Sequence, residues 1–391
     1  MRKQEQIRQL KTLLSRLDSG MTVDAGGHLH NPMSAYVDPD LAARERAEFF
    51  TEHPQMIGLS GDLPEPGSFL TLNDLAVPIL ATRTAGGEFK AFVNACRHRG
   101  VVVEDRPRGE TKRFTCPFHS WSYATDGALV GVPKKEHFGE IDPQCHGLVE
   151  LPAVERYGLL WVHQDPNATL DIDSLLGEEL ADELDSWGLG TLVHLGGDSY
   201  EIDCNWKLAM DTFGETYHFS SLHKDTLYNA FHGNVQCYDT FGRHHRMLLC
   251  KREIDNMRLL PEDEWHVAVG TLPVYWLFPN VQLMPSSEGL YLVRAYPHPT
   301  EPGRHTSIVT FYLWPRVVAD AGMAELMKEI GQRFAEIIRD EDYVAGASQQ
   351  RVADSGALTY ATFGRNEPAL HHYHNTYREV LGLDTLPLVE A

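Results

Sequence analysis

Two cysteines and two histidines stand in two short motifs of this chain that one bound group can join. The first motif is Cys96-x-His98, the second is Cys116-x-x-His119, and 17 residues separate them. Two thiolates and two imidazoles form a set of soft to borderline metal ligands. Gly100 follows the first motif and a proline interrupts the second, which indicates that each motif lies at a turn. We therefore predict that two loops clamp one metal centre from opposite sides.

The order of the four ligands distinguishes between two kinds of centre. Zinc sites mostly take their ligands as C-x2-4-C and H-x3-5-H pairs, with like residues together. Here each motif supplies one cysteine and one histidine. In a Rieske [2Fe–2S] cluster two cysteines bind one iron and two histidines bind the other. The mixed order therefore favours a Rieske cluster over zinc, with Cys96, His98, Cys116 and His119 as its predicted ligands.

The stretch from Asn94 to Pro133 resembles the Rieske domain of the ring-hydroxylating oxygenase family, and Tyr123 is part of the resemblance. Ser120 stands where that family commonly has glycine, and we expect no loss because the residue stays small. Respiratory Rieske proteins brace their cluster loops with a disulfide. The cysteines for it would be needed at Val101 and Phe118, and neither is present. The missing brace fits the lower part of the Rieske potential range, roughly −150 to +300 mV.

A second group of metal-binding residues follows further along the chain. If residues 205–222 form a helix, Asp211, Glu215 and His218 share one stripe at i, i+4 and i+7, and His223 follows after a bend. Two histidines and one carboxylate form the facial triad of non-haem Fe(II) oxygenases. This spacing is weak evidence by itself. The Rieske motif in the same chain makes a mononuclear iron site the favoured interpretation.

The two patterns together resemble the α subunits of Rieske oxygenases over nearly the whole chain. The resemblance implies that His218 and His223 bind iron. It also implies that Glu215 is the acid that bridges an iron-ligand histidine and a cluster histidine of the neighbouring subunit, here His119. The family usually has aspartate there, and glutamate occurs in a branch that resembles the carnitine oxygenases. Asp211 is the second predicted catalytic acid, with an ordinary helix-face acid as the alternative.

The third iron ligand is expected in a long helix predicted from about Ala321 to Gln350. Periodicity does not decide between the three carboxylates of Asp340-Glu341-Asp342. The resemblance favours Asp342, because the family's ligand precedes an aliphatic stretch and a glutamine. Glu341 and Asp340 stay open as alternatives, and a solvated charge run is the interpretation without metal. The predicted apolar stripe of this helix is Met323, Leu326, Ile330, Phe334 and Ile337.

The length of 391 residues suits two domains. Short β-rich runs between turn signals predict a small antiparallel β domain, the Rieske domain, at residues 50–165. Residues 166–391 are predicted to form the catalytic mononuclear-iron domain, and helical residues 1–49 are its N-terminal part. The expected fold class is α+β, with a small antiparallel-β Rieske domain and a catalytic domain built on a helix-covered antiparallel sheet.

Charge and hydropathy exclude several classes of partner. The formal net charge of −21 opposes nucleic-acid binding. We find no apolar run of eighteen residues and no secretory signal, so we predict no membrane span and a cytoplasmic location by default. The chain has no glycine-rich dinucleotide fingerprint, so electrons are expected from a separate NAD(P)H-dependent reductase, a ferredoxin or both. The resemblance implies a homotrimer, with or without a small β subunit.

These observations predict an O2-dependent oxygenase with a [2Fe–2S] Rieske cluster and a mononuclear Fe(II). Its reaction would be hydroxylation, cis-dihydroxylation or oxidative dealkylation of a small organic, aromatic substrate. One alternative is a monooxygenase that cleaves C–N bonds of a quaternary amine, to which Glu215 points weakly. Another is a Rieske electron-transfer protein without oxygenase activity. The substrate pocket is expected to be apolar and to draw on some of Met210, Phe231, Tyr275, Leu277 and Phe278.

Overall fold

The structure is a computed structural model that describes residues 1–389. The chain divides into two compact units. The large unit comprises Met1–Arg46, Leu176–Trp187 and the chain from His194 onward, and the small unit comprises Ala47–Leu175 and Gly188–Val193. The sequence did not predict that the chain returns to the small unit at residues 188–193.

A seven-stranded sheet forms the centre of the large unit, with the strand order β13-β19-β18-β17-β16-β15-β14. From β14 to β19, each strand pairs antiparallel with the next. Every residue of β16 and β17 is buried, which is the pattern of a sheet covered on both faces. The bounds are β13 Val193–Ile202, β14 Phe231–Phe241, β15 His244–Lys251, β16 Thr271–Leu277, β17 Val281–Pro285, β18 Gly289–Pro297 and β19 His305–Leu313.

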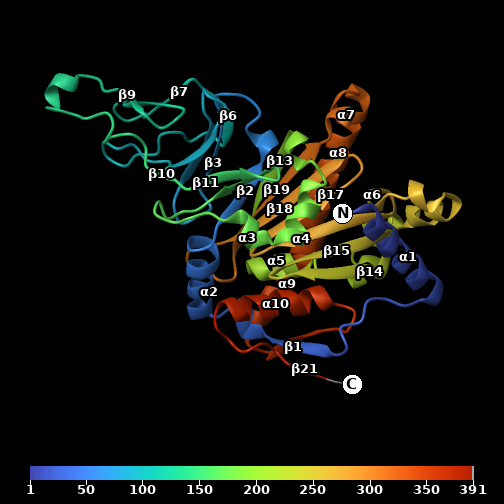
Figure 1. The fold of residues 1–391 in the computed structure, drawn as a ribbon. Coiled ribbons are helices and arrows are strands. Elements are labelled where there is room, and N and C mark those ends of the chain that lie inside the picture. Colours follow the sequence, from blue (N-terminus) through green and yellow to red (C-terminus); the bar gives the residue numbers. More distant parts are fainter. Residues whose placement is uncertain (390–391) are drawn as a thin grey trace. The chain divides into compact units, whose positions relative to one another are not determined.

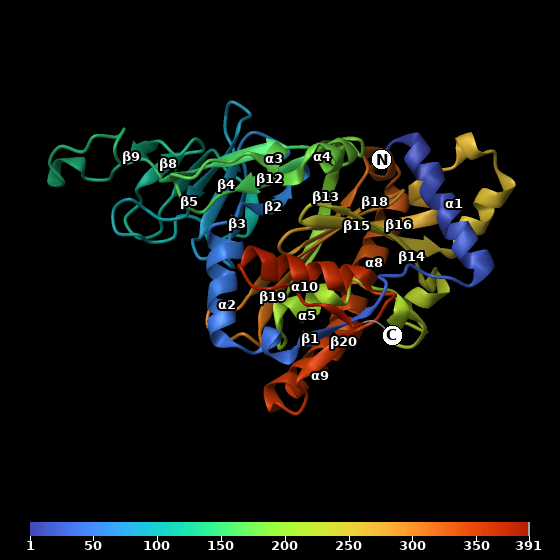
Figure 2. The same ribbon diagram turned by 60° about the horizontal axis from the view of Figure 1, so that its bottom comes forward.

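The large unit also contains helices, with the bounds α1 Lys3–Ser19, α2 Pro39–Glu45, α4 Glu178–Asp185, α5 Trp206–Asp211, α6 Val267–Gly270, α7 Pro315–Val318, α8 Ala321–Ile337, α9 Tyr343–Ser355 and α10 Pro368–Val380. Of these, α1, α5, α6 and α8 pack against strands of the sheet (Figure 1). The prediction of helical residues 1–49 holds for α1, where Leu10, Leu13 and Leu14 are buried in one core with residues of β14 and β15, but it is wrong at His28–Pro32, which form a β-strand. Helix α10 lies beside α5 (Figure 2), where the Trp206 and Tyr377 rings are 5.0 Å apart.

The predicted long helix of residues 321–350 is interrupted. A π-helical segment, η10 (Ile338–Asp342), joins α8 to α9. The apolar stripe is also only partly buried, because Met323, Leu326 and Ile330 are exposed whereas Ile337 is buried. The buried residues of α8 are Gly331, Ala335 and Ile337, all in its C-terminal half, and Gly331 packs there against Phe311 of β19.

The small unit contains three small sheets. Their strand orders are β10-β5-β4-β3-β6, β11-β12-β2 and β7-β8-β9, and the pairings are antiparallel. The bounds are β2 Gln55–Leu59, β3 Ser68–Leu72, β4 Ile79–Arg83, β5 Phe89–Val93, β6 Arg108–Glu110, β7 Arg113–Thr115, β8 Ser122–Ala124, β9 Leu129–Gly131, β10 Glu150–Leu151, β11 Ala153–Arg156 and β12 Leu159–Val162, followed by α3 Ile172–Leu176.

The remaining strands of the large unit form a third layer of short pairings. Strand β1 (His28–Pro32) pairs with β20 (Tyr360–Phe363) on one side and with β21 (Leu388–Val389) on the other, both antiparallel. The predicted α+β class, with antiparallel sheets in both units and helices over the large one, is confirmed. Among residues 1–389, none of the helices has the length and apolar character required to cross a membrane.

Candidate metal centres

The two cysteine–histidine motifs form two loops with the same backbone pattern. In the first, the Cys96 amide donates to the Val101 carbonyl at 2.8 Å, and the Gly100 amide donates back to the Cys96 carbonyl at 2.8 Å. In the second, the Cys116 amide donates to the carbonyl of Trp121 at 2.8 Å, and the Ser120 amide donates back to that of Cys116 at 3.0 Å. Both loops need a left-handed residue at the fourth position after cysteine.

Gly100 and Ser120 occupy these left-handed positions, with φ of 76° and 58°. Glycine adopts this conformation at little cost, whereas a residue with a side chain is disfavoured there by about 1–2 kcal/mol. Serine at position 120 therefore has a backbone cost that glycine would not have, contrary to the expectation of no loss. The small side chain is tolerated, but the backbone conformation is the one that glycine prefers.

The four predicted cluster ligands lie together at the end of the small unit. Cys96 and Cys116 are buried, His98 is half-buried and His119 is exposed. The ring centroids of His98 and His119 are 4.7 Å apart, and the two rings meet edge to face at an interplanar angle of 69°. Burial raises the pKa of the Cys116 thiol, and the nearby Cys96 raises it further. Two neighbouring thiols beside two neighbouring imidazoles are the donor set of a Rieske [2Fe–2S] cluster, so the residues present fit that group.

Tyr123 adds a polar contact to this donor set. Its hydroxyl lies 3.2 Å from the Cys96 sulfur and accepts a hydrogen bond from the Arg97 amide at 3.0 Å. Burial raises the pKa of Tyr123 above its ordinary value, and the contact with Cys96 raises it further. Because the hydroxyl oxygen of Tyr123 accepts the hydrogen bond from the Arg97 amide, its own proton is free to be donated to the Cys96 sulfur.

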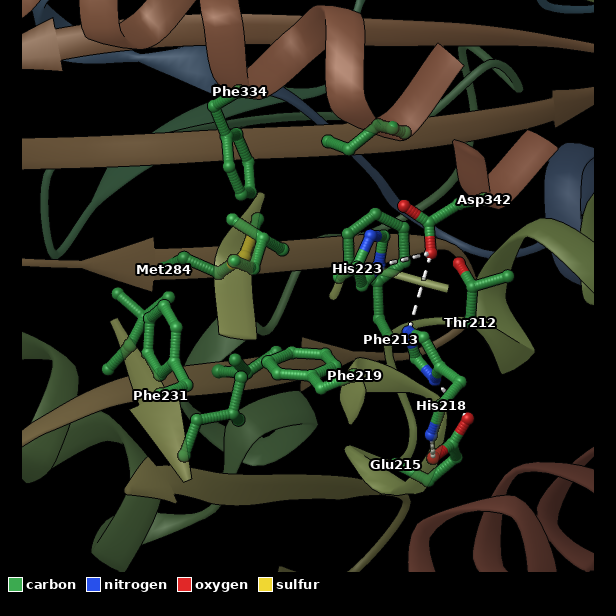
Figure 3. A pocket seen from close by; sticks show the side chains of 15 residues that line it. Thr212, Phe213, Glu215, His218, Phe219, His223, Phe231, Met284, Phe334 and Asp342 are labelled. Atoms are coloured by element: carbon green, nitrogen blue, oxygen red, sulfur yellow. Dashed lines mark hydrogen bonds and ion pairs between the residues drawn. The ribbon is translucent and has the colours of Figure 1, made fainter. Parts of the chain in front are cut away.

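The second group of ligands comes from two distant segments of the large unit. His218 lies in a short 3-10 helix, η6 (Tyr217–Ser220), His223 follows in a turn, and Asp342 ends η10. One ligand atom from each residue can be chosen so that all lie within 4.8 Å of one another. The Asp342 Oδ1 atom is 3.6 Å from His218 Nε2 and 3.3 Å from His223 Nε2 (Figure 3).

These three side chains fit a metal that would occupy the space between them. His218 Nε2 is buried and has no hydrogen-bond partner among the described residues. An unpaired buried nitrogen costs free energy unless a ligand satisfies it. Burial lowers the pKa of His223, but Asp342 and Glu341 outweigh this effect and the net shift is upward. Two imidazoles and one carboxylate on one side of a space match the facial triad of a non-haem iron.

The predicted helix over residues 205–222 is wrong beyond Asp211, where α5 ends. Glu215 provides one reason, because its carboxylate accepts hydrogen bonds from the Tyr217 and His218 amides and so starts a new turn. Gly214 provides another, because a Cβ there would lie 2.5 Å from Leu370 and 2.8 Å from Tyr373 of α10. The close approach of α10 leaves no room for a side chain, and the shared stripe does not form.

Each histidine of the triad has its own carboxylate behind it. The Nδ1 atom of His218 is hydrogen-bonded to Glu215, and Nδ1 of His223 donates to Glu341 Oε2 at 2.7 Å. Asp340, the third acid of its run, is exposed and paired with Arg339. Consecutive residues of an ordinary helix point about 100° apart. The π-helical turn of η10 presents Glu341 and Asp342 to opposite nitrogens of the same ring.

Asp211 is buried in a hydrogen-bonded network of its own. It accepts from the Tyr36 hydroxyl at 2.8 Å and contacts His374 Nε2 at 2.9 Å, while Asn31 donates to Tyr36 at 2.9 Å. Within residues 1–389, no direct hydrogen bond joins Asp211 to His218 or His223. Asp211 therefore has hydrogen-bond partners of its own, although it lines the same cavity as Glu215, His218 and Asp342, and its role as a catalytic acid stays a prediction. The residues that hold it, Tyr36 and His374, were not singled out as partners from the sequence.

Two cavities border the triad. The first, here called the apolar slot, has a volume of about 40 Å³, well below the roughly 300–1,000 Å³ of ordinary ligand pockets. Its lining beyond Thr212 and the acid and histidine residues is apolar: Phe213, Phe219, Leu227, Phe231, Leu249, Leu272, Val274, Met284, Phe334 and Ile338 (Figure 3). Of the five residues expected at a pocket, only Phe231 lines the slot.

The second cavity, here called the hollow, has a volume of about 570 Å³ and borders Glu215, His218 and Asp342 from another side. Leu222, Gln349 and Glu367 also line it. Burial raises the pKa of Glu367 to about 6, although a hydrogen bond from the Gly364 amide lowers it. The charges of Glu215 and Asp211 raise it further. Glu367 is a titratable residue of this site that no sequence motif indicated.

Comparison with protein-family models gives two matches. The Rieske [2Fe-2S] domain matches residues 53–152. The catalytic domain of the ring hydroxylating alpha subunit matches residues 189–383.

Curated relatives match about half of the chain. The biphenyl 2,3-dioxygenase subunit alpha of Rhodococcus jostii (strain RHA1) is 32% identical over 198 residues, which cover 48% of this chain and 43% of that protein. The glycine betaine monooxygenase oxygenase subunit of Chromohalobacter salexigens is 31% identical over 202 residues, which cover 50% and 43%. The chain therefore matches less than half the length of either relative.

Solved structures share the fold over most of the chain. A quaternary ammonium Rieske monooxygenase in complex with L-carnitine has a TM-score of 0.75 at 18% identity, covering 91% of this chain and 96% of that one. Naphthalene 1,2-dioxygenase from Rhodococcus sp., bound to indole, has a TM-score of 0.73 at 19% identity, covering 96% and 98%. At these identities the likeness describes the fold alone.

Proposed function

Since this chain belongs to the α subunits of the Rieske-type ring-hydroxylating oxygenases, we propose that it uses O2 and external electrons to oxidise a small aromatic substrate. The reaction is hydroxylation, cis-dihydroxylation or oxidative dealkylation. The observation that carries the proposal is the convergence of His218, His223 and Asp342 within 4.8 Å beside an apolar slot. In this proposal they hold the mononuclear iron, and Cys96, Cys116 and two histidines hold the Rieske cluster.

The two metal groups supply one-electron transfer and O2 activation when bound. The chain's own residues supply orientation. His218 and His223 present Nε2 to the metal because carboxylates occupy both Nδ1 atoms. Asp342 adds the negative charge that a divalent ion requires. The apolar slot excludes water and holds the substrate beside the triad. With so small a volume, its phenylalanine and methionine side chains must turn aside to admit an aromatic ring.

Glu215 is the residue proposed to carry electrons to the iron site from the cluster of a neighbouring subunit. Two observations support this role: its hydrogen bond to Nδ1 of His218 and its position on the wall of the hollow. The exposed His119 supports it from the side of the cluster, because a partner can reach it. A homotrimer, with or without a small β subunit, is part of the proposal. So is an NAD(P)H-dependent reductase or ferredoxin as the electron source.

A monooxygenase that cleaves C–N bonds of a quaternary amine is the second candidate. Glu215 in place of the usual aspartate and the sequence similarity to a glycine betaine monooxygenase oxygenase subunit favour it. The lining of the slot opposes it. Carnitine and glycine betaine carry a carboxylate as well as a cation, and no lysine or arginine is among the described residues that line the slot. Tryptophan and tyrosine, which bind cations well, are also absent from that lining.

The test begins with metal and sulfide analysis of anaerobically purified protein. About three irons and two acid-labile sulfides per chain are expected, since a [2Fe–2S] cluster and one further iron are proposed. Substrate-dependent O2 uptake is then measured with biphenyl, naphthalene and benzene in one series and with carnitine and glycine betaine in another. Activity with the aromatic series supports the main proposal. Activity with the amines alone would replace it, and zinc without sulfide would exclude both.

A further inference from the structure

Glu341 contacts an iron-site histidine from behind. His223 is 1% exposed, and its two ring nitrogens face two carboxylates. Nε2 lies 3.3 Å from Asp342, whereas Nδ1 donates to Glu341 Oε2 at 2.7 Å. The two acids are adjacent in the chain, and the π-helical turn of η10 carries both. One short segment therefore supplies a proposed metal ligand and the hydrogen-bond acceptor of another.

Glu341 has a second partner. The Thr226 hydroxyl donates to the same Oε2 atom at 3.0 Å. Thr226 belongs to the turn that begins at His223, because its amide donates to the His223 carbonyl at 3.0 Å. Leu227, the next residue, lines the apolar slot. Glu341 thus joins three parts: a metal-facing ring, the backbone turn that carries it and the wall of the slot.

We propose that Glu341 is a positioning residue that holds the His223 ring with Nε2 toward the metal and that Thr226 holds Glu341 in place. This inference rests on the proposed iron site. The physical reason is that an imidazole has one proton to give when neutral. A carboxylate at Nδ1 keeps the proton there, leaves the Nε2 lone pair for the metal and makes the ring a stronger donor.

The carboxylates behind the two histidines have different tasks in this proposal. Glu215 lines the hollow, and its assigned role includes electron transfer. Glu341 is not among the described residues that line the hollow, and its second contact is with Thr226 instead. Loss of the Glu341 charge is therefore expected to weaken metal binding while electron delivery to the remaining bound iron proceeds. Loss of the Glu215 charge affects both.

The test measures metal binding without turnover. A chelator removes the mononuclear iron from cluster-loaded protein, and Co²⁺ alone is then titrated against a competing fluorescent chelator. Glu341→Gln keeps the size of the side chain but removes its charge, and a 10- to 100-fold weaker Co²⁺ affinity is expected. Glu341→Asp should recover part of the affinity. Thr226→Val, which removes only the hydroxyl, should have a smaller effect than Glu341→Gln.

A second readout reports the geometry of the site. The oxidised [2Fe–2S] cluster has no EPR signal, so the spectrum of high-spin Co²⁺ can be recorded in the same protein. Glu341→Gln is expected to shift it. Co²⁺ affinity within twofold of wild type, with an unchanged spectrum, would overturn the proposal. Cluster absorbance confirms that each variant folds, and if Glu341→Gln is not recovered, Glu341→Ala with unchanged affinity and spectrum has the same meaning.

Asp342→Asn separates this inference from the proposed function. If wild-type protein binds Co²⁺ and Asp342→Asn does not, the metal site stands, and the Glu341 variants decide the inference alone. If Asp342→Asn binds Co²⁺ as wild type does, the assigned ligand set is wrong, and so is the positioning role built on it.

Discussion

The cluster loops of the small unit and the triad of the large unit are assembled in different ways. Each cluster loop is closed by its own backbone, with Cys96 paired to Val101 and Cys116 to Trp121. The triad depends on segments that are distant in sequence, since Glu341, the residue before Asp342, lies 118 positions from His223. The cluster histidines are also accessible, with His119 exposed, whereas His223 is almost fully buried.

This difference fits the tasks proposed for the two sites. A centre that receives electrons from another protein benefits from ligands at the surface, and local loops can hold them there. A centre that activates O2 needs a dry space, and that space requires walls from several elements of the fold. The triad meets this need with residues of η6, of the following turn and of η10 beside the apolar slot.

The largest expected effect tests whether the triad needs its distant member. Asp342→Asn removes the charge that faces both histidines, so the mononuclear iron should be lost and O2 uptake abolished, while the cluster stays. Iron analysis should give about two irons per chain instead of about three. Asp340→Asn is the matched control, because Asp340 is exposed and paired with Arg339. Equal iron content in both variants would contradict the assignment of Asp342.

The next effect concerns the connection between the two kinds of site. Glu215→Gln keeps the side-chain length but removes the charge that holds His218. Reoxidation of the reduced cluster by O2 and substrate, followed by stopped-flow absorbance, should slow by about 10- to 100-fold. Cluster content should not change. Glu215→Asp, which restores the family's usual residue, tests whether length matters. A rate in Glu215→Gln equal to that of wild type would remove the bridging role.

A smaller effect concerns the stability of the large unit near the hollow. The pKa of Glu367 rises from an ordinary 4.5 to about 6, so the native state binds more protons than the unfolded state between these values. Its destabilising contribution is absent below pH 4.5 and complete above pH 6. Glu367→Gln should therefore raise the free energy of unfolding by about 1–2 kcal/mol at pH 8 and by nothing near pH 4.5.

Urea unfolding at the two pH values checks this prediction. Glu253→Gln is the control, because it removes the same charge from an exposed position. If the burial of Glu367 causes the gain in the free energy of unfolding, the control, which loses one negative charge from an exposed position, should show no such gain. An equal gain at both pH values, or an equal gain in the control, would speak against it.

The smallest effect lies in the cluster loops. Tyr123→Phe removes the hydroxyl beside the Cys96 sulfur. The reduced cluster carries more negative charge and gains more from this hydrogen bond, so its loss should lower the reduction potential. A bond worth about 1 kcal/mol corresponds to about 40 mV for one electron. Tyr157→Phe removes a hydroxyl that donates to Asp173 in the same unit and should leave the potential unchanged. Spectroelectrochemistry distinguishes the two variants.

That Cys96, His98, Cys116 and His119 lie together could be predicted from the sequence because the geometry of the two loops is local. Residue type and spacing within two short motifs determine the turns, and Gly100 marks one of the left-handed positions. The convergence of His218 and His223 could also be predicted, but only through the association of their motif with the Rieske motif. The helix expected to carry them was wrong beyond Asp211, because the packing of α10 against Gly214 and the capping by Glu215 end it.

The sequence by itself determined which residue types are available for each centre, together with the α+β class of the fold. Only the tertiary structure decided which acid of Asp340-Glu341-Asp342 faces which nitrogen, that Asp211 belongs to a separate network with Tyr36, and which apolar residues line the slot. The physical reason is the distance along the chain over which the deciding contacts act. Turns and caps depend on neighbours in the chain, whereas the direction of a side chain on η10 depends on a π-helical register and on the contacts that hold it.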